Sequence, residues 1–201
     1  MNSENLRLIE EINQLWKPVY PYLAQHILEV YGRQDGNILE VGPFCGVIFN
    51  LQEEKVGDSF LIATFPPKMT NYFRREAIER GVEGKIKVFE SDPYLSGIEE
   101  KTIDLAIFRG AFFFPSLGEA NLSEIHRVLR PGGFAFIGGG FGKQTPEAVI
   151  KNIGKKSQEL NLRLGKIHLS EKKLRQNLQA TKLKGKIELI SEGGLWVIMK
   201  K

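Results

Sequence analysis

The residue types and spacing best suited to chemistry occur between Asn37 and Gly46. This stretch, Asn-Ile-Leu-Glu-Val-Gly-Pro-Phe-Cys-Gly, places the acidic Glu40 near the end of a short apolar run and puts glycine at 42 and 46 in the turn beyond it. Glycine has no Cβ atom, so a ligand can approach the backbone closely at both positions. In open α/β sheets, ligands bind at the carboxyl ends of the strands. The stretch therefore predicts a strand followed by a ligand-binding turn, although its spacing alone does not name the ligand.

Three further stretches follow in order and carry groups that could complete a site. Asp92 stands in Ser-Asp-Pro after an apolar run at 85–90, and Arg109 directly follows another apolar run at 103–108. A charged residue directly after a buried strand is unusual, so Arg109 belongs either to a site or to a structural ion pair. The third stretch, Val-Leu-Arg-Pro-Gly-Gly, ends at Gly133 and predicts a turn into the next strand.

Together these four motifs resemble the class I S-adenosylmethionine-dependent methyltransferases. The shared features are a strand-one loop of the type E/D-x-G-x-G-x-G, an acidic residue after strand three, a fourth strand led by Asp-Leu at 104–105, and the turn at 128–133. The resemblance spans residues 16 to 199 and implies S-adenosylmethionine as the cofactor. It also implies a set of cofactor-binding residues, namely Glu40, Gly42, Pro43, Phe44, Gly46, Thr64, Phe65, Asp92, Arg109 and Tyr20.

The same resemblance implies roles within this set. Glu40 and the two glycines of the loop would line the amino-acid end of the cofactor, and Asp92 would reach the adenine amine. Arg109 would stand at the rim of the site after strand four. Tyr20, with Trp16, would lie near the cofactor in an N-terminal helical lid formed by residues 1–31.

Two residues depart from the family pattern where the cofactor should bind. Phe44 replaces the middle glycine of the loop, and Thr64 replaces the acidic residue that accepts hydrogen bonds from both ribose hydroxyls. Losing a charge-assisted pair of bonds costs roughly 1.5–3 kcal/mol, or about ten- to a hundredfold in affinity. Thr64 still offers one hydroxyl. The ring of Phe44 either turns into the core or narrows the pocket.

Apolar periodicity predicts the elements that position these residues. Short β-rich runs alternate with amphipathic stretches, after two helical pieces over residues 4–31 that are interrupted at Pro18 and Pro21. This pattern predicts one α/β domain over residues 1–201, with a Rossmann-like, seven-stranded, mostly parallel sheet, helices on both faces and an antiparallel C-terminal hairpin. The expected strands are 37–41, 59–64, 85–90, 103–108, 134–137, 186–190 and 195–199; the expected helices are 46–54, 66–80, 117–129, one starting at 146 and 170–180.

Composition limits the partners of the chain. Its single cysteine, Cys45, excludes an internal disulfide, and the three histidines are scattered, so we expect no metal. No apolar run is long enough to span a bilayer and no signal peptide is evident, so we expect a cytoplasmic protein without a membrane partner. From Lys143 onward, 14 Lys and Arg stand against 5 Asp and Glu. These cations lack interleaved aromatics, which favours solvated helix faces over a nucleic-acid partner.

The sequence therefore predicts an S-adenosylmethionine-dependent methyltransferase that acts on a small-molecule acceptor by in-line transfer. Because the cofactor carries the leaving group, alignment and exclusion of water supply most of the acceleration, and no catalytic residue is assigned. Two alternatives stay open: a non-catalytic binding module with the same fold, favoured by Phe44 and Thr64, and a nucleic-acid methyltransferase that uses the basic C-terminal part. A nicotinamide-dependent oxidoreductase is disfavoured, because no G-x-G-x-x-G follows the first strand.

Overall fold

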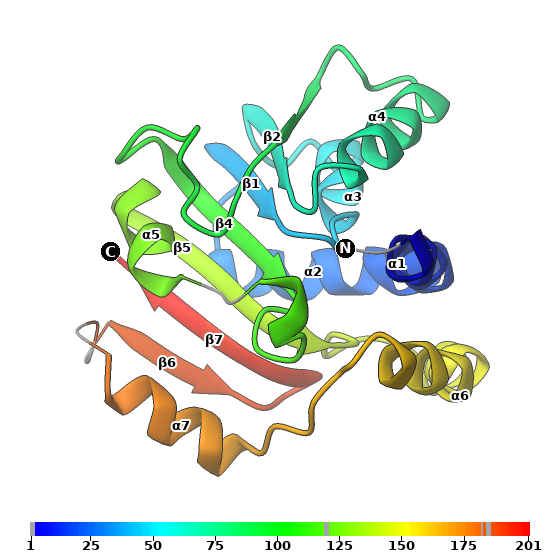
Figure 1. The fold of residues 1–201 in the computed structure, drawn as a ribbon. Coiled ribbons are helices and arrows are strands. Elements are labelled where there is room, and N and C mark those ends of the chain that lie inside the picture. The colour runs from blue at the N-terminus through cyan, green and yellow to red at the C-terminus, as the bar shows by residue number, and fades with distance from the viewer. Residues whose placement is uncertain (1–2, 119–120, 182, 184–185) are drawn as a thin grey trace.

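The computed structural model describes residues 3–118, 121–181, 183 and 186–201. Its described strands form a seven-stranded sheet in the order β3-β2-β1-β4-β5-β7-β6 (Figure 1). Strands β1 to β5 run parallel, and β7 is antiparallel to both of its neighbours. This order confirms the predicted α/β fold and its antiparallel C-terminal hairpin. The strands are β1 (Asn37–Val41), β2 (Ser59–Thr64), β3 (Ile86–Glu90), β4 (Ile103–Arg109), β5 (Leu129–Gly140), β6 (Ile187–Ile190) and β7 (Gly194–Lys200).

Helices cover both faces of this sheet, and each face has its own apolar core. One core joins the sheet to α1 (Ser3–Trp16), α2 (Tyr20–Tyr31), α3 (Val47–Glu53), α4 (Met69–Glu79) and α6 (Glu147–Arg163). The other joins it to α5 (Leu122–Val128) and α7 (Glu171–Gln179). Because both faces are covered, the central strand β4 is buried along its whole length, as expected for a parallel strand.

Local sequence signals account for several element boundaries. The break that the prolines predict is a short 3-10 turn, η1 (Lys17–Val19), between α1 and α2. The Ser170 side chain accepts a hydrogen bond from the backbone N–H of Lys173 at 3.2 Å and so caps α7, as its sequence predicted. At the amino end of the sheet, the Asp104 carboxylate accepts from the backbone N–H of Asn37 and from Arg130, which ties β1, β4 and β5 together.

Two predicted boundaries are wrong around β5. Residues 130–133 were expected to form a turn and 138–140 to follow the strand, yet both belong to β5. Leu129 pairs with Ile103 and Phe134 with Leu105, so residues 130–133 form an irregularity of the strand without partners in the β4 register, whereas the three glycines pair with β7. A Cβ atom at Gly138 or Gly140 would collide with the β7 side of the ladder, so glycine permits this close approach.

The region before α5 also differs from the predicted helix at 117–129. The helix begins only at Leu122, where Asn121 accepts a hydrogen bond from the Glu124 backbone at 3.2 Å. A separate 3-10 turn, η2 (Pro115–Leu117), precedes it, and residues 119–120 lie outside the described residues. Proline at the first position of η2 and the Asn121 cap explain why one continuous helix does not form.

Candidate active site

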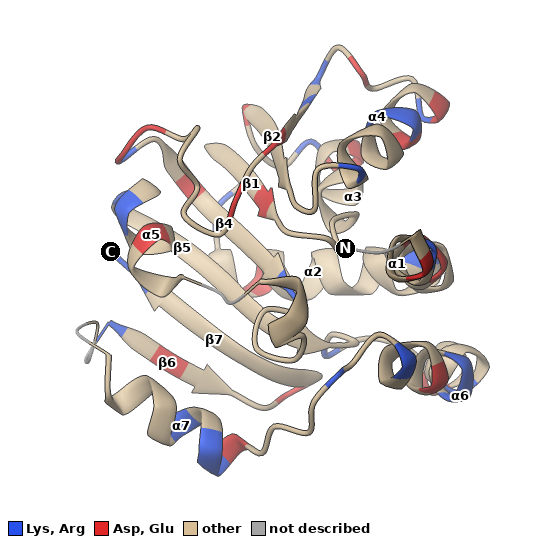
Figure 2. Cartoon of the chain, in the orientation of Figure 1, with Lys and Arg blue, Asp and Glu red and all other residues tan. Residues whose placement is uncertain are grey.

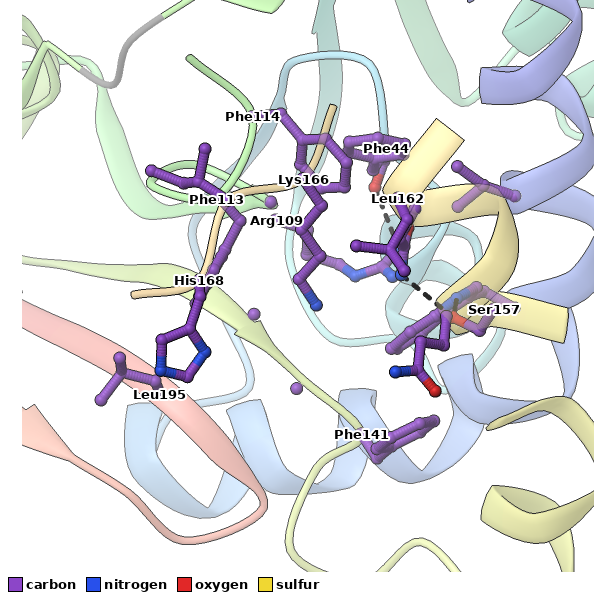
Figure 3. A pocket seen from close by; sticks show the side chains of 18 of the residues that line it. Phe44, Arg109, Phe113, Phe114, Phe141, Ser157, Leu162, Lys166, His168 and Leu195 are labelled. Carbon is purple, nitrogen blue, oxygen red and sulfur yellow. Dashed lines mark hydrogen bonds between the residues drawn. The ribbon is translucent and has the colours of Figure 1, made fainter. Parts of the chain in front are cut away.

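A cavity of about 480 Å³ opens at the carboxyl ends of β4 and β5. Side chains reach it from α1, from the loops after β1, β4 and β5, from α6, and from the segment 166–168 that follows α6 (Figure 3). Its volume is that of an ordinary small-molecule site, and the carboxyl edge of a parallel sheet is where such sites occur. Two residues of the predicted set, Phe44 and Arg109, line this cavity.

Arg109 is a buried cation held by aromatic rings. It is 6% exposed, and its guanidinium carbon lies 5.0 Å from the ring centre of Trp16 and 4.6 Å from that of Tyr20. Its Nη1 atom donates to the backbone oxygen of Phe44 at 3.0 Å. None of the ion pairs formed by the described residues includes Arg109. Of the two interpretations that the sequence left open, the structure therefore gives no support to the ion pair.

Glu40 lies beneath the loop that follows β1, out of contact with the cavity. Its side chain is fully buried, and its carboxylate accepts hydrogen bonds from the backbone N–H groups of Gly46, Val47 and Ile48 at 2.8, 3.4 and 3.0 Å. Burial raises the pKa of Glu40, while these bonds and the nearby Arg109 charge oppose the rise. The carboxylate thus holds the loop against the first turn of α3.

Tyr20 and Asn13 fasten the same loop from the lid helices. The Asn13 amide donates to the backbone oxygen of Pro43 at 2.8 Å, and the Tyr20 hydroxyl donates to the Asn13 side-chain oxygen at 3.2 Å. The Tyr20 ring occupies the space that a Cβ atom at Gly46 would need. Burial raises the pKa of Tyr20, although the Arg109 charge beside it acts in the opposite direction. The lack of a side chain at Gly46 therefore makes room for the Tyr20 ring of the protein itself.

The residues predicted to hold the nucleoside lie at the carboxyl ends of β2 and β3. Thr64 is fully buried, and its hydroxyl has no hydrogen-bond partner among the described residues. Asp92 instead accepts from the Tyr94 and Ser96 backbone N–H groups and from the Ser96 hydroxyl. Burial works against ionisation of Asp92, but these hydrogen bonds outweigh it and lower its pKa.

Rings and a turn of the chain fill the space around these groups. A Cβ atom at Gly42 would lie 2.7 Å from the Phe108 ring, and that ring packs edge-on against Phe65 at 5.8 Å. The Cα of Gly118, which follows η2, is so placed that its missing Cβ would lie 3.2 Å from both Phe65 and Pro93. The turn thus occupies the gap between the ends of β2 and β3.

The donor set fits an adenosyl cofactor in part. The unpartnered, buried Thr64 hydroxyl stands where the family places its ribose-binding side chain, which favours a ligand there. The Asp92 carboxylate is already engaged, and the turn at Gly118 must give way before an adenine can lie between Phe65 and Pro93.

The sequence predicted no role for several residues that line the cavity. Phe113 and Phe114 follow β4, Phe141 follows the three glycines of β5, and Lys166 lies between α6 and α7. The aromatic run after Gly110 and the Phe141 position were visible signals, because both follow buried strands. Lys166 was not distinguishable from the other lysines of the basic C-terminal part.

Cys45 has no chemical role in this arrangement. Its side chain is buried and its thiol donates to the Gly42 backbone oxygen at 3.2 Å. Burial raises its pKa well above the ordinary value, which keeps the thiol protonated and unreactive. No group of three His, Cys, Asp or Glu side chains in the described ranges is arranged to hold a metal ion. No helix in those ranges is long and apolar enough to cross a membrane.

Comparison with known proteins identifies the family of the sheet that carries this site. A family model described as "Methyltransferase domain" matches residues 39–137, from β1 to the middle of β5. Residues 39–137 therefore resemble the methyltransferase domain family over just under half of the chain. Beyond that match, solved structures of methyltransferases share the fold over nearly the full length of the chain. No curated protein matched the sequence.

Solved structures resemble this chain over nearly its full length. A Methanococcus maripaludis protein, described as a "putative s-adenosyl-l-methionine-dependent methyltransferase", has 23% identity and a TM-score of 0.78, over 98% of this chain and 91% of the other. A methyltransferase from Aquifex aeolicus has 16% identity and a TM-score of 0.62, over 96% of each chain. Geranyl diphosphate C-methyltransferase from Streptomyces coelicolor has 13% identity and a TM-score of 0.56, over 88% and 73%.

Proposed function

We propose that this protein is a methyltransferase that transfers a methyl group from S-adenosylmethionine to a small molecule bound in the cavity beside Phe44 and Arg109. The observation that carries the proposal is the position of the cavity: it adjoins the loop after β1 and lies over the ends of β4 and β5. The geranyl diphosphate methyltransferase, solved with a diphosphate substrate analogue and S-adenosyl-L-homocysteine, is a fold relative with a small-molecule acceptor. The cytoplasmic location stays a prediction from the sequence.

The residues of this chain would orient the two reactants and exclude water from them. The cofactor, when bound, supplies the electrophilic methyl group together with its leaving group. Rings from α1 and from the loops after β1, β4 and β5 would exclude water and restrict the acceptor to one orientation. Glu40 would keep the loop after β1 in place through its three backbone hydrogen bonds.

Thr64 supplies the sharpest test of cofactor binding. We expect the Thr64→Val variant to bind S-adenosylhomocysteine about two- to tenfold more weakly in isothermal titration calorimetry, because a hydroxyl that bonds the ribose is lost. Its free energy of unfolding should not fall, because the hydroxyl has no partner in the free protein. Thr70→Val is the matched control: Thr70 on α4 also has a buried, unpartnered hydroxyl but lies outside the proposed site, so affinity should not change.

The wild-type protein provides the primary result. S-adenosylhomocysteine at a hundred times its dissociation constant should stabilise the protein by about 2.7 kcal/mol, measured as a shift of the thermal transition. No heat and no thermal shift with millimolar S-adenosylmethionine or S-adenosylhomocysteine would reject methyl transfer. That result would favour the non-catalytic binding module, for which the turn between Phe65 and Pro93 is the structural argument.

A further inference from the structure

The charges and rings of the cavity define the class of molecule that it accepts. We propose that the acceptor is an organic anion: an apolar, flat body that carries a carboxylate or phosphate group, with Arg109 and Lys166 binding the anionic group. Only the role of the bound anion as methyl acceptor rests on the proposed function. The anion-binding site itself rests on the residues that line the cavity. The family resemblance implied a place for Arg109 at the rim of the cofactor site and gave Lys166 no role, so anion binding by this pair is a new assignment.

Arg109 is the inner of the two cations. A buried guanidinium without a carboxylate partner is costly, and a ligand that supplies the missing negative charge recovers much of that cost. Glu40 lies behind the loop and offsets part of the charge, but its carboxylate is engaged with three backbone N–H groups. The guanidinium presents five donors in a fixed plane, and its recorded bond to Phe44 uses one nitrogen. Its geometry suits bidentate recognition of a carboxylate or phosphate.

Lys166 is the outer cation, at the mouth of the same cavity. In Figure 3 its side chain extends into the space in front of Arg109. Its Nζ atom lies 5.2 Å from the ring centre of Phe113. None of the ion pairs among the described residues includes Lys166. Burial lowers the pKa of Lys166, which is the response of a cation that lacks a negative partner.

Among the residues that the structure describes, no acidic side chain lines the cavity, and this decides the sign of the ligand. Arg109, Lys166 and His168 are the charged or titratable groups that line it, and its other polar side chains are Ser157, Gln158 and Asn161. A cationic acceptor would meet like charges at both ends. A neutral acceptor would leave the buried cation without a counter-charge. An anionic acceptor avoids the contacts between like charges and also supplies the counter-charge that the buried cation lacks.

Aromatic walls determine the rest of the molecule. Trp16 and Phe141 stack face to face, with ring centres 4.8 Å apart and planes 9° apart, and Phe44 packs against Phe114 at 4.9 Å. Leu162 and Ile167 are 62% and 43% exposed, and both line the cavity. Apolar side chains that remain exposed beside a hollow favour an apolar ligand body. A bare inorganic anion would leave these apolar side chains in contact with water.

Calorimetric titrations without any cofactor test the binding site at 150 mM NaCl. The probes are 2-naphthoate, 2-naphthyl phosphate and the neutral 2-naphthamide, which share one aromatic body. We expect at least one anionic probe to bind about tenfold or more tightly than the amide, and the two anions distinguish carboxylate from phosphate recognition. Equal affinity for the acids and the amide would overturn the proposal.

Substitutions of Lys166 test whether this residue causes the preference for anionic over neutral probes. Its side chain is exposed enough to be replaced without loss of the fold. Lys166→Gln should reduce the preference for the anion about three- to tenfold, and Lys166→Arg should retain it. Lys155→Gln is the matched control, because it removes the same charge from an exposed position on α6 outside the cavity lining. An effect of Lys155→Gln as large as that of Lys166→Gln would mean general attraction and would overturn the proposal.

The pH dependence gives an independent readout. Affinity for 2-naphthoate should fall as the pH rises through the lowered pKa of Lys166, and the fall should vanish in Lys166→Arg but persist in His168→Gln. A fall that persists in Lys166→Arg would reject the role of Lys166. Because these titrations contain no cofactor, anion binding without binding of S-adenosylhomocysteine would overturn methyl transfer while supporting the anion site.

Discussion

At the scale of single residues, Glu40 shows how a motif residue can serve the fold. Family resemblance places it at the amino-acid end of the cofactor, whereas its carboxylate here binds the first N–H groups of α3. Such bonds replace those that a helix start lacks, and the positive end of the helix favours the negative charge. A contact with bound cofactor stays a prediction for this residue.

The raised pKa of Glu40 leads to a pH-dependent stability. A folded-state pKa above the unfolded value means that the folded protein binds the proton more tightly, so the free energy of unfolding falls as pH rises above the unfolded pKa. Relative to Glu40→Gln, which cannot ionise, the wild type should lose up to about 1.4 kcal/mol per pH unit in this window. Urea unfolding from pH 4.5 upward measures the difference.

Glu83→Gln supplies the control for this measurement, because Glu83 is exposed and lies between α4 and β3. A stability difference between the wild type and Glu40→Gln that follows the same course with pH as that of Glu83→Gln would show that burial of the Glu40 carboxylate does not perturb its titration.

Sequence reasoning at the residue scale found one side of the cavity. Phe44 and Arg109 were predictable because Phe44 follows β1 and Arg109 ends β4, where topology brings strand ends together. Lys166 and the α6 side chains were not, because the position of a helix after the last parallel strand depends on tertiary packing. The unpartnered state of Thr64 was equally invisible, since a hydroxyl's partners are known only from coordinates.

At the scale of elements, one buried hydrogen bond joins α6 to α1. The Trp16 indole donates to the Ser157 hydroxyl at 2.9 Å, and the Asn161 amide donates to the same oxygen at 3.2 Å. Ser157→Ala leaves both donors buried and unpaired, so we expect the free energy of unfolding to fall by about 1–3 kcal/mol in urea titrations. Asn152→Ala, at an exposed position of α6, should change it by less than about 0.5 kcal/mol. Equal effects would contradict this role of Ser157.

Element types were largely predictable, and the errors lie around β5 and α5. The strands β1 to β4 and the capped helix α7 follow apolar periodicity and a local serine signal. The glycines at both ends of β5 suggest turns, because glycine usually interrupts strands. Gly138 and Gly140 instead pair with β7, which is distant in sequence and comes too close for a side chain at either position.

At the scale of the whole molecule, carboxylates offset part of the charge of the basic C-terminal part. Helices α6 and α7 carry acidic residues as well as Lys and Arg (Figure 2). Several are paired with carboxylates: Lys143 with Glu29, Lys151 with Glu147, Lys156 with Glu159, Arg163 with Glu4 and Arg175 with Glu171. Internal pairing reduces the charge available to phosphates.

This pairing predicts weak binding of nucleic acid. In fluorescence anisotropy with a labelled single-stranded RNA of about 20 nucleotides at 150 mM NaCl, the dissociation constant should be weaker than about 10 μM, within the range of non-specific contacts. Submicromolar binding that falls steeply between 50 and 200 mM NaCl would instead favour the nucleic-acid methyltransferase.

The segment from Gly110 to Gly118 touches both halves of the site. Its first residues line the cavity with Phe113 and Phe114, and its last lies against Phe65 and Pro93. If a nucleoside displaces one end, we expect the wall at the other end to shift, so that occupancy of the two halves is energetically linked. Linkage is reciprocal: whatever factor the nucleoside applies to acceptor affinity, the acceptor applies to nucleoside affinity. The protein would then respond to a complete pair of reactants through one short stretch of backbone.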